Sequence, residues 1–404
     1  MSLPSECVLL AAGEGKRMRP LTANRPKVMI PIANRPMLEH LITAAVQAGI
    51  RCFVIVVGYE EQAIREYFGD GSWFGIEIEY VVQRRQLGTA DALRSAEGLV
   101  SGNFLMMNGD MILGTEDIRS LCNMAVPALG VSETEHPEDY GVVILEGDRV
   151  TRLEEKSKSP LGRLINAGAY LFSQDIFDRI KKIGLSGRGE YELTDALFQY
   201  IDEGVLSATS FQSWMDVGYP WDILAVHETL LTELQAENLG TVEEGVVLKG
   251  PVCIQEGTTI RCGSSIEGPC IIGRDCIIGP HAYIRPKTVI GDFCHIGHAV
   301  EIKNSVIFPG SKIPHFNYIG DSVIGSGCNF GAGTKIANLR HDYGIVSVGG
   351  KMTGRKKFGA VVGDDVLFGI NCSVNTGTLI GSGCRIVPHS FVDGVYGDKS
   401  IISR

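Results

Sequence analysis

The chain has 404 residues, which is enough for two or three domains. Its composition is that of an ordinary globular protein, and its net charge of −10 argues against a general nucleic-acid coat, so an anionic substrate must be held by local arginines and lysines. No apolar run reaches the roughly 18 residues of a membrane span and the first residues lack a signal-peptide pattern, so we expect a cytoplasmic protein with no membrane or nucleic-acid partner.

Short apolar runs alternate with amphipathic segments over the first 239 residues, which predicts an α/β domain with a mostly parallel sheet. We expect strands at Glu6–Ala12, Cys52–Val57, Ile76–Val82, Phe104–Met107, Ala128–Ser132, Gly141–Leu145, Ala167–Phe172 and Ala208–Ser213. We expect helices at Met37–Ala48, Glu60–Phe68, Thr89–Val100, Gln174–Lys182, Leu193–Asp202 and Trp221–Glu237.

A loop rich in glycine and arginine follows the first strand and continues to Pro26-Lys27. Its glycines let backbone N–H groups approach phosphates closely, and Arg17 and Lys27 supply positive charge. The loop is neither a Walker loop nor the full dinucleotide fingerprint, and a tight strand–loop turn is the plain alternative. The cations in one loop of an acidic protein favour phosphate binding.

Two aspartates support a metal site. Asp110 and Asp216 each follow an expected strand, and ligands bind at the carboxyl ends of strands in open α/β sheets. A carboxylate can hold Mg²⁺ that also bridges phosphates. A single loop aspartate is more often a turn residue, but two of them together with a phosphate loop favour magnesium.

Six separated motifs occur in order: Leu10–Arg17 with Pro26-Lys27, Gln83–Thr89, Gly109-Asp110, Glu155-Lys156, Asn166–Gly168 and Asp216–Gly218. Together they resemble the sugar-1-phosphate nucleotidylyltransferase family over nearly all of residues 5–235. The resemblance implies a Rossmann-like nucleotidyltransferase domain. It also implies in-line attack by a sugar-phosphate oxygen on the α-phosphorus of a nucleoside triphosphate, with release of pyrophosphate. Positioning and charge neutralisation supply most of the acceleration in such a reaction.

The same resemblance implies a role for each motif residue. The nucleotide base is read by the backbone of Leu10, Ala11, Ala12 and Gly13 and by Gln83, with Gly88 and Thr89 adjoining. Arg17 and Lys27 hold the triphosphate, and Asp110 and Asp216 bind Mg²⁺. The sugar is held by Gly141, Glu155 and Asn166, and its phosphate by Lys156.

From about Val242 the sequence has an aliphatic residue at every sixth position. The members are Val242, Leu248, Ile254, Ile260, Ile266, Ile272, Ile278, Ile284, Ile290, Ile296 and Ile302, and after a break Val362, Phe368, Val374, Ile380, Ile386 and Val392. A step of six predicts a parallel β-helix of hexapeptide repeats over residues 240–404. Small residues, six of the eleven cysteines among them, fill a second inward position, and glycines one place after the ladder residue are expected at corners.

Residues that break the repeat indicate a second site. Arg285 and Lys303 replace the recurring glycine, His315 and Tyr318 follow, and a basic excursion at Lys351–Lys357 interrupts the coils. These residues resemble the acetyltransferase half of the bifunctional glucosamine-1-phosphate acetyltransferase/N-acetylglucosamine-1-phosphate uridylyltransferase family, whose β-helix is left-handed and trimeric.

That second resemblance also assigns roles. His315 is implied as the general base; Arg285 and Lys303 hold the sugar phosphate with Tyr318 and Asn329 beside it; Ala332, Asn338 and Lys357 lie on the acetyl-coenzyme A side. The chain departs from the family in the longer segment after Asn338 and at Ile370, which stands where the family has serine.

The leading hypothesis is a bifunctional enzyme that acetylates glucosamine 1-phosphate, or galactosamine 1-phosphate, and then transfers a uridylyl group from UTP with Mg²⁺. UTP and dTTP present similar base edges to Gln83 and both stay open. A monofunctional enzyme, such as a glucose-1-phosphate thymidylyltransferase or a mannose-1-phosphate guanylyltransferase with a structural or regulatory solenoid, is the second hypothesis. A catalytically silent scaffold is the third.

Overall fold

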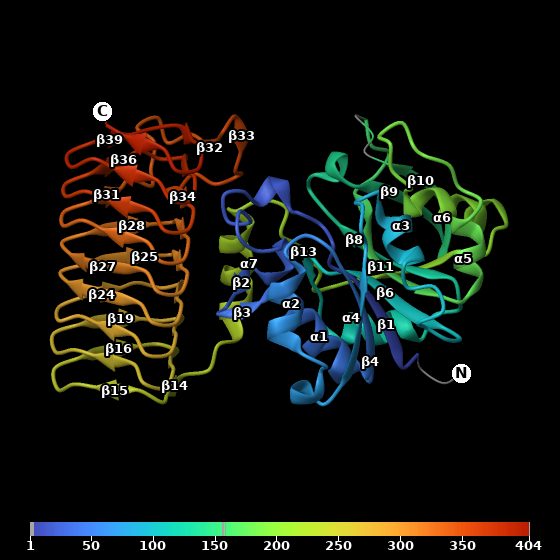
Figure 1. Ribbon diagram of the computed structural model, residues 1–404, viewed down its shortest axis with the longest axis horizontal. Helices are drawn as coiled ribbons and strands as arrows, with labels where there is room; N and C mark the ends of the chain where they lie inside the picture. The colour runs from blue at the N-terminus through green and yellow to red at the C-terminus, as the bar shows by residue number, and fades with distance from the viewer. Residues whose placement is uncertain (1–3, 156, 158, 404) are drawn as a thin grey trace. The chain divides into compact units, whose positions relative to one another are not determined.

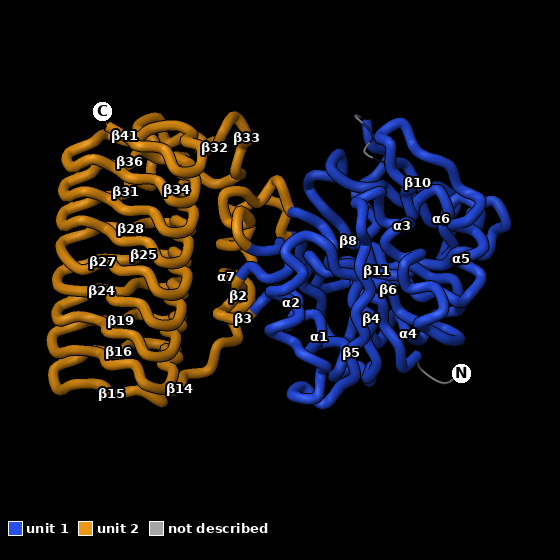
Figure 2. The backbone as a smooth tube through the Cα atoms, in the orientation of Figure 1, with its two compact units in different colours: residues 1–14, 25–30, 36–216 blue, residues 15–24, 31–35, 217–404 orange. Residues whose placement is uncertain are grey.

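The computed structural model describes residues 4–155, 157 and 159–403. These form two compact units (Figures 1 and 2). The first contains residues up to 14, 25–30 and 36–216, and the second contains residues 15–24, 31–35 and those from 217 onward. Among the described helices, none combines the length and the hydrophobicity that a membrane span requires.

The described part of the first unit contains a nine-stranded sheet in the order β5-β4-β1-β6-β11-β8-β12-β10-β9. Its strands are β1 (Glu6–Leu10), β4 (Cys52–Val57), β5 (Glu77–Val82), β6 (Phe104–Asn108), β8 (Ala128–Glu133), β9 (Gly141–Glu146), β10 (Arg149–Glu155), β11 (Leu164–Phe172) and β12 (Ser207–Ser210). The α/β class is confirmed, and helices cover both faces of the sheet (Figure 1).

The expectation of a mostly parallel sheet holds for only part of it. β5, β4, β1 and β6 are parallel, and so are β8 and β12. β11 runs antiparallel to β6 and β8, and β10 runs antiparallel to β9 and β12. The expectation was wrong for this half because β9 and β10 form a hairpin around Gly147, a strand connection that needs no crossover helix.

The expected helices are present, two of them with clearly earlier ends, and one further helix, Thr115–Cys122, was not expected. The first unit contains α1 (Met37–Ala48), α2 (Glu61–Phe68), α3 (Thr89–Arg94), α4 (Thr115–Cys122), α5 (Asp175–Ile180) and α6 (Leu193–Asp202). The expected helix to Val100 ends at Arg94. The expected helix to Glu237 is α7 (Asp222–Leu230), followed by a 3-10 turn and then by a strand that already pairs with the β-helix.

Short elements complete the N-terminal part of the chain. They are 3-10 turns at η1 (Lys16–Met18), η2 (Lys27–Met29), η3 (Ser72–Phe74), η4 (Pro137–Asp139) and η5 (Leu231–Glu233), and strands at β2 (Pro31–Ile32), β3 (Arg35–Pro36), β7 (Met111–Ile112) and β13 (Met215–Asp216).

A parallel β-helix forms the larger part of the second unit, as the step of six predicts, with its described strands stacked in three sheets (Figure 1). The first sheet holds β14 (Glu237–Asn238), β17 (Val252–Ile254), β20 (Cys270–Ile272), β23 (Thr288–Ile290), β26 (Val306–Ile307), β29 (Val323–Ile324), β34 (Ala360–Val362), β37 (Thr378–Ile380) and β40 (Val395–Tyr396). The second holds β15 (Thr241–Val242), β18 (Thr259–Ile260), β21 (Ile277–Ile278), β24 (His295–His298), β27 (Lys312–His315), β30 (Asn329–Phe330), β35 (Leu367–Phe368), β38 (Arg385–Ile386) and β41 (Ile401–Ile402). The third holds β16 (Val247–Lys249), β19 (Ser265–Glu267), β22 (Tyr283–Ile284), β25 (Glu301–Lys303), β28 (Tyr318–Gly320), β31 (Lys335–Ile336), β36 (Ser373–Val374) and β39 (Phe391–Val392).

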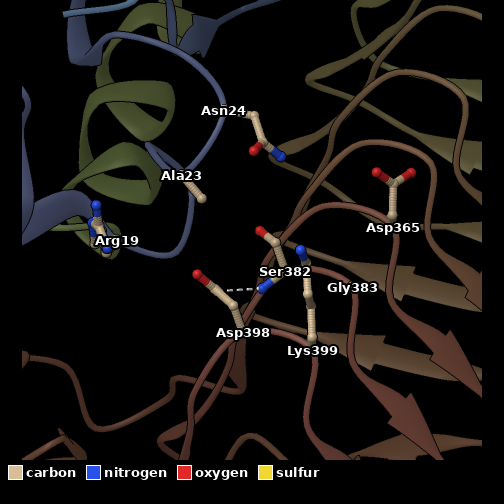
Figure 3. A pocket seen from close by; sticks show the side chains of 8 residues that line it. All are labelled: Arg19, Ala23, Asn24, Asp365, Ser382, Gly383, Asp398 and Lys399. Carbon is tan, nitrogen blue, oxygen red and sulfur yellow. Dashed lines mark hydrogen bonds between the residues drawn. The ribbon is translucent and has the colours of Figure 1, made fainter.

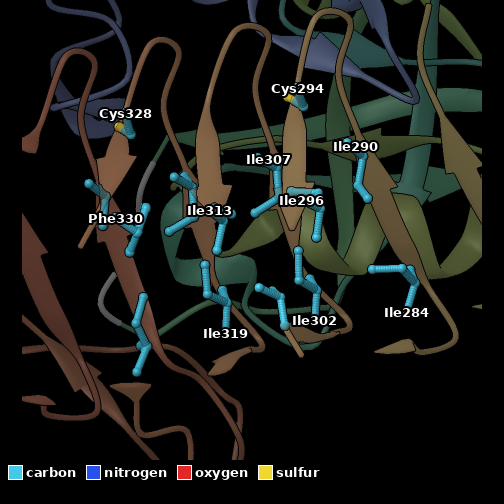
Figure 4. Packing of buried hydrophobic residues seen from close by; sticks show 14 of the residues in the cluster. Ile284, Ile290, Cys294, Ile296, Ile302, Ile307, Ile313, Ile319, Cys328 and Phe330 are labelled. Carbon is cyan, nitrogen blue, oxygen red and sulfur yellow. The ribbon is translucent and has the colours of Figure 1, made fainter. Parts of the chain in front are cut away.

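The aliphatic ladder forms the core of this β-helix. Ladder isoleucines such as Ile284, Ile296 and Ile302 are fully buried and point into a shared interior (Figure 4). The small residues of the second inward position are buried as well, and the six cysteines there are free thiols. Leu248 is an exception, because it lies near the first coil and stays 39% exposed.

The glycines after the ladder residues are needed for a different reason than the expected corner. The glycines that directly follow ladder residues include Gly273, Gly279, Gly291 and Gly297. Of these four, only Gly279 has a positive φ. A Cβ at Gly297 would lie 2.0 Å from the Pro314 carbonyl oxygen, so the adjacent coil leaves no room for a side chain. The corners themselves occur two places further on, where residues such as Asp275 and Phe293 adopt positive φ.

The excursion before Val362 is a packed insertion between β31 and β34. It contains the hairpin β32 (Ser347–Val348) and β33 (Lys351–Met352). Val346, Val348 and Phe358 are buried, and Phe358 meets the Trp221 ring edge-on at a centroid distance of 6.4 Å.

Candidate active sites

Lys27, Asp110 and Asp216 lie together in the first unit. The Lys27 ammonium is 2.6 Å from Asp110 Oδ2 and 4.0 Å from Asp216 Oδ1, and the lysine side chain is only 8% exposed. Asp110 follows β6 through Gly109, whose amide donates to the Leu10 carbonyl. The aspartate is therefore held beside the end of β1, where the glycine-rich loop begins.

The two aspartates are brought together by a short antiparallel pair. β7 follows Asp110, β13 contains Asp216, and Asp216 lies opposite Met111 in their register. A buried carboxylate, Asp117 on α4, holds the segment before β13 by accepting the amides of Gln212 at 2.9 Å and Ser213 at 2.8 Å. The sequence gives no pattern that distinguishes Asp117 from an ordinary polar residue of a helix.

The residues present fit a magnesium ion. Mg²⁺ is usually held by one or two carboxylates together with substrate phosphates rather than by a cage of protein ligands. Asp110 and Asp216 supply two such carboxylates, and the Lys27 ammonium between them shows that their negative charge converges on a cation position. Among the described residues, there is no group of three or more His, Cys, Asp or Glu that could hold a metal without help from substrate.

The segment predicted to read the base, Leu10–Gly13, is buried at its two alanines and exposed at Gly13. Ala11 and Ala12 are buried, and the Gln86 side-chain amide, which the sequence reasoning did not single out, donates to the Ala12 carbonyl at 2.9 Å. The Gln83 amide donates to the Gly88 carbonyl and to Asp91. Gly88 has φ +104°, and a Cβ there would lie 2.4 Å from the Tyr191 carbonyl oxygen, so only glycine fits. Thr89 accepts the Leu193 amide.

Arg17 belongs to the second unit. Its guanidinium lies over the Tyr219 ring, 5.4 Å from the centroid, and Tyr219 stacks on Trp221 at 4.8 Å. The Arg17 side chain is exposed. The Tyr219 ring thus supports the exposed guanidinium from one face.

The residues predicted to bind the sugar converge on β9, β10 and β11. Gly141 pairs with Glu155, and a Cβ at Gly141 would lie 2.8 Å from Glu155 Oε2 and 3.8 Å from the Asn166 Cβ. The Asn166 amide donates to the Tyr170 hydroxyl at 2.7 Å, and burial raises the pKa of that phenol. Lys156 lies outside the described residues.

Tyr140 connects the sugar residues to the carboxylate pair, and sequence reasoning missed it. Its hydroxyl donates to Asp216 Oδ2 at 2.8 Å, and its ring meets Trp214 edge-on. Trp214 in turn donates from its indole nitrogen to the Ala167 carbonyl at 2.9 Å. Tyr140 directly precedes Gly141, which is the signal that could have drawn attention to it.

In the second unit, Arg285, Lys303 and Tyr318 lie on neighbouring rungs of the third sheet. Arg285 donates to Glu301 at 3.0 Å, which raises the pKa of the guanidinium, and Lys303 lies 3.3 Å from Asp321. Burial raises the pKa of the Tyr318 phenol, and the Asp321 and Glu301 carboxylates raise it further. Arg285 and Lys303 therefore lie on the third-sheet face of the β-helix, each beside a carboxylate, with the Tyr318 phenol near both carboxylates.

His315 is the last residue of β27 in the second sheet, opposite His298 in the register of β24. Its side chain is exposed and outside the inward ladder, as expected. Phe316 follows it with φ +54°, and the chain turns there into β28, which carries Tyr318. The histidine is thus on the same coil as Tyr318 and one corner away from it.

The coils and the insertion that follow carry Asn329, which was predicted to lie beside the sugar phosphate, and the residues predicted for acetyl-coenzyme A, which are Ala332, Asn338 and Lys357. Asn329 lies between Lys312 and Leu367 in the second sheet, and the Ala332 carbonyl accepts the Asn371 amide at 2.8 Å. Asn338 donates to Asp321, and Lys357 forms an isolated bridge with residue 339 at the base of the insertion.

A cavity of about 260 Å³ lies elsewhere in the second unit (Figure 3). Its walls are formed by Arg19, Ala23, Asn24, Asp365, Ser382, Gly383, Asp398 and Lys399. Asp398 accepts the Ser382 amide, and two acids balance two bases around the space. It contains none of the residues predicted for nucleotide, sugar or acetyl-coenzyme A, so we assign it no role in either reaction.

Comparison with known proteins gives matches to both units. The nucleotidyl transferase family matches residues 6–233, and a family described as the GMPPB C-terminal domain matches residues 266–402. The chain is 40% identical to the bifunctional protein GlmU of Methanococcus maripaludis, over 99% of this chain and 97% of that protein. It is also 40% identical to a bifunctional sugar-1-phosphate nucleotidylyltransferase/acetyltransferase of Sulfurisphaera tokodaii, over 96% of this chain and 98% of that protein.

Solved structures resemble the nucleotidyltransferase part. A Bacillus anthracis structure described as a glucose-1-phosphate thymidylyltransferase, in complex with sucrose, is 27% identical with a TM-score of 0.53. The match covers 58% of this chain and 97% of that one. A UDP-glucose pyrophosphorylase structure, at 21% identity and a TM-score of 0.53, shares the fold.

Proposed function

Because the chain belongs to the family of bifunctional sugar-1-phosphate nucleotidylyltransferases/acetyltransferases, we propose that it makes a UDP-N-acetylamino sugar in two steps. The first step moves the acetyl group of acetyl-coenzyme A to the amine of glucosamine 1-phosphate, with galactosamine 1-phosphate as the alternative acceptor. The second joins the product to the uridylyl group of UTP and releases pyrophosphate, with Mg²⁺ as cofactor. We place the enzyme in the cytoplasm as a homotrimer, with the domains meeting near residue 240.

The approach of Lys27 to both Asp110 and Asp216 carries the uridylyl part of the proposal. A bound Mg²⁺ would neutralise charge on the triphosphate and on the leaving pyrophosphate. Lys27 would hold a phosphate oxygen, and Arg17 would add a second cation. The backbone of Leu10–Gly13 and Gln83 would orient the base.

The acceptor sugar would be held by Gly141, Glu155 and Asn166, with Lys156 on its phosphate. Glycine at position 141 leaves the space beside Glu155 open, and the Tyr170 hydroxyl orients the Asn166 amide. Tyr140 keeps Asp216 in place beside this sugar position. Positioning the attacking oxygen in line with the α-phosphorus requires no covalent intermediate.

For acetyl transfer, His315 would act as general base. The amine attacks the acetyl carbonyl as the base takes its proton, and the coenzyme A thiolate then leaves and is protonated. Arg285 and Lys303 would fix the sugar phosphate, with Tyr318 and Asn329 beside it, while Ala332, Asn338 and Lys357 would face acetyl-coenzyme A. Imidazole suits proton removal near neutral pH.

A second candidate is a monofunctional nucleotidylyltransferase whose β-helix is structural or regulatory. The match of residues 266–402 to the GMPPB C-terminal domain and the pairing of Arg285 and Lys303 with acids in the solenoid are compatible with it. The monofunctional candidate keeps the roles of Asp110, Asp216 and Lys27, and it gives the β-helix residues no role in acetyl transfer.

Product analysis by mass spectrometry distinguishes the two candidates. The protein would be incubated with Mg²⁺, UTP, dTTP or GTP, a panel of sugar and amino-sugar 1-phosphates, and with or without acetyl-coenzyme A. We expect UDP-N-acetylglucosamine from glucosamine 1-phosphate only when acetyl-coenzyme A is present. If a nucleotide-sugar forms from UTP or dTTP but never carries an acetyl group, the bifunctional proposal is wrong and the monofunctional one is supported. If no nucleotide-sugar forms at all, both proposals are wrong.

A further inference from the structure

Asp321 is a buried carboxylate among the acetyl-transfer residues of the second unit. Its side chain is 4% exposed. Three side chains donate to it: Lys303 to Oδ2 at 3.3 Å, Asn304 to Oδ1 at 2.8 Å, and Asn338 to Oδ2. Two of these donors, Lys303 and Asn338, are residues to which the proposed function assigns substrate phosphate and acetyl-coenzyme A.

The position of Asp321 in the fold does not by itself require a carboxylate. It occupies the corner between β28 and β29 with φ +49°, and the same corner of other coils carries glycine, as at Gly250 and Gly377. Aspartates with positive φ also occur at a different corner, between the first and second sheets, as Asp275 and Asp365, and both of those are exposed. A charge is costly to bury unless it is paired and hydrogen-bonded, so a buried aspartate here indicates a role in holding its donors.

Lysine and asparagine need such support to act on a substrate. The flexible lysine side chain loses about 2 kcal/mol of rotamer entropy when it is fixed, and an acceptor that fixes it beforehand lowers that cost on binding. The side-chain NH₂ group of Asn338 has two N–H donors at a fixed angle to each other. When one of them donates to Asp321, the direction of the other is fixed as well. One carboxylate thus orients two groups of the proposed acyl-transfer site, and both donate to the same oxygen, Oδ2.

The network extends beyond Asp321. Asn304 also donates to Glu228 of α7 at 3.2 Å, and Glu228 pairs with Arg355 of the insertion and lies 3.8 Å from Lys287. The insertion that carries Lys357 is therefore connected through α7 and Asn304 to the same aspartate. This continuity sets Asp321 apart from a carboxylate that pairs with one lysine.

We propose that Asp321 is a positioning residue of the acetyl-transfer site, which holds Lys303 for the sugar phosphate and Asn338 for acetyl-coenzyme A. The inference rests on the proposed acetyl transfer. Asp321 touches neither substrate and acts through its two donors. An asparagine at this position would replace one acceptor oxygen by a donor NH₂ group and set donor against donor.

The test compares steady-state acetyl transfer by the full-length wild type and Asp321→Asn, with glucosamine 1-phosphate and acetyl-coenzyme A varied in turn. We expect KM for glucosamine 1-phosphate to rise on the order of ten- to a hundredfold, the range for losing a hydrogen bond to a charged group. Uridylyl transfer to preformed N-acetylglucosamine 1-phosphate should stay unchanged. The double variant with Lys303→Ala should bind the sugar phosphate no worse than Lys303→Ala alone.

Asp364→Asn is the matched control. Asp364 is equally buried in the same β-helix and accepts the amide of Ser326, a residue to which the proposed function assigns no substrate, at 2.8 Å. We expect its variant to keep the wild-type KM values. Asn304→Gly is a milder second variant, because the φ of +44° suits glycine and only one donor to Asp321 is lost. It should raise the same KM by a few fold even if Asp321→Asn does not fold.

The outcomes separate the inference from the function on which it rests. A wild type that neither acetylates nor binds glucosamine 1-phosphate in calorimetry would overturn the proposed acetyl transfer and the inference together. An active wild type with unchanged KM values in both Asp321→Asn and Asn304→Gly would overturn the inference alone. Equal losses in Asp321→Asn and Asp364→Asn would show a general effect of buried charge and would also overturn it.

Discussion

Asp110→Asn removes one of the two carboxylates that face Lys27 and leaves the shape of the loop almost unchanged. The Lys27 ammonium loses its partner at 2.6 Å and keeps Asp216 at 4.0 Å. Because the lysine side chain is 8% exposed and the Asp110 side chain 40%, the loss lies between that of a surface pair and that of a buried one. We expect the free energy of unfolding to fall by about 1–2 kcal/mol.

The expected loss of activity is larger than this loss of stability. A carboxylate that holds a metal on the reacting phosphates contributes at least the hundredfold scale of transition-state charge stabilisation, about 2.7 kcal/mol. Asp110→Asn should therefore reduce uridylyl transfer by at least about a hundredfold while the protein stays folded at 25 °C. Acetyl transfer should survive, since all of its proposed residues belong to the second unit and Asp110 belongs to the first.

Three measurements on one preparation test this reasoning. They are pyrophosphate release from UTP and N-acetylglucosamine 1-phosphate, acetyl transfer to glucosamine 1-phosphate, and unfolding in denaturant. Asp148→Asn, at an exposed turn of the same unit, is the control for loss of one negative charge. Wild-type pyrophosphate release by Asp110→Asn would refute the assignment, and so would a parallel loss of both activities. Asp216→Asn should behave in the same way.

Three further predictions concern assembly and stability. Gly297→Ala should lower the free energy of unfolding of the β-helix by about 1–3 kcal/mol in denaturant, because the added Cβ would meet the Pro314 carbonyl. Gly397→Ala is the control and should be neutral, because nothing lies within 4 Å of its added Cβ. Burial, helped by the Arg261 charge, lowers the pKa of His295, so the unfolded chain binds that proton at a higher pH than the folded protein does. The free energy of unfolding should then fall as pH drops below about 6.5, and His295→Gln should flatten this dependence. Light scattering should show a trimer at micromolar concentration, and a monomer would count against acetyl transfer as well.

The sequence predicted the β-helix most completely, because a six-residue period is produced by few structures. Ile254 to Ile302 are inward-facing at every rung, as the period requires. The reason for the glycines was wrong, since the repeat does not show that Gly297 faces a carbonyl of the next coil. Leu248 fits the period but has too few neighbouring coils to bury it.

In the first unit, periodicity predicted the strands of the parallel half and missed the β9–β10 return. Alternation along the chain shows that segments are strands and does not show which neighbours they pair with. The carboxylate pair was predictable because both aspartates follow strands and lie in recognisable motifs. Tyr140, Asp117 and Asp321 were not, since their roles depend on partners up to 96 residues away or on burial that appears only in the folded chain.

The central claim is that one chain carries two reactions on two separate units, and His315→Ala tests it most directly. Acetyl transfer and uridylyl transfer from preformed N-acetylglucosamine 1-phosphate would be measured on the same purified variant. His315 is exposed and outside the buried ladder, so the fold should persist. We expect acetyl transfer to fall by about a hundred- to ten-thousandfold, the range for losing a general base, and uridylyl transfer to stay unchanged. Undiminished acetyl transfer, or equal loss of both activities, would contradict the account.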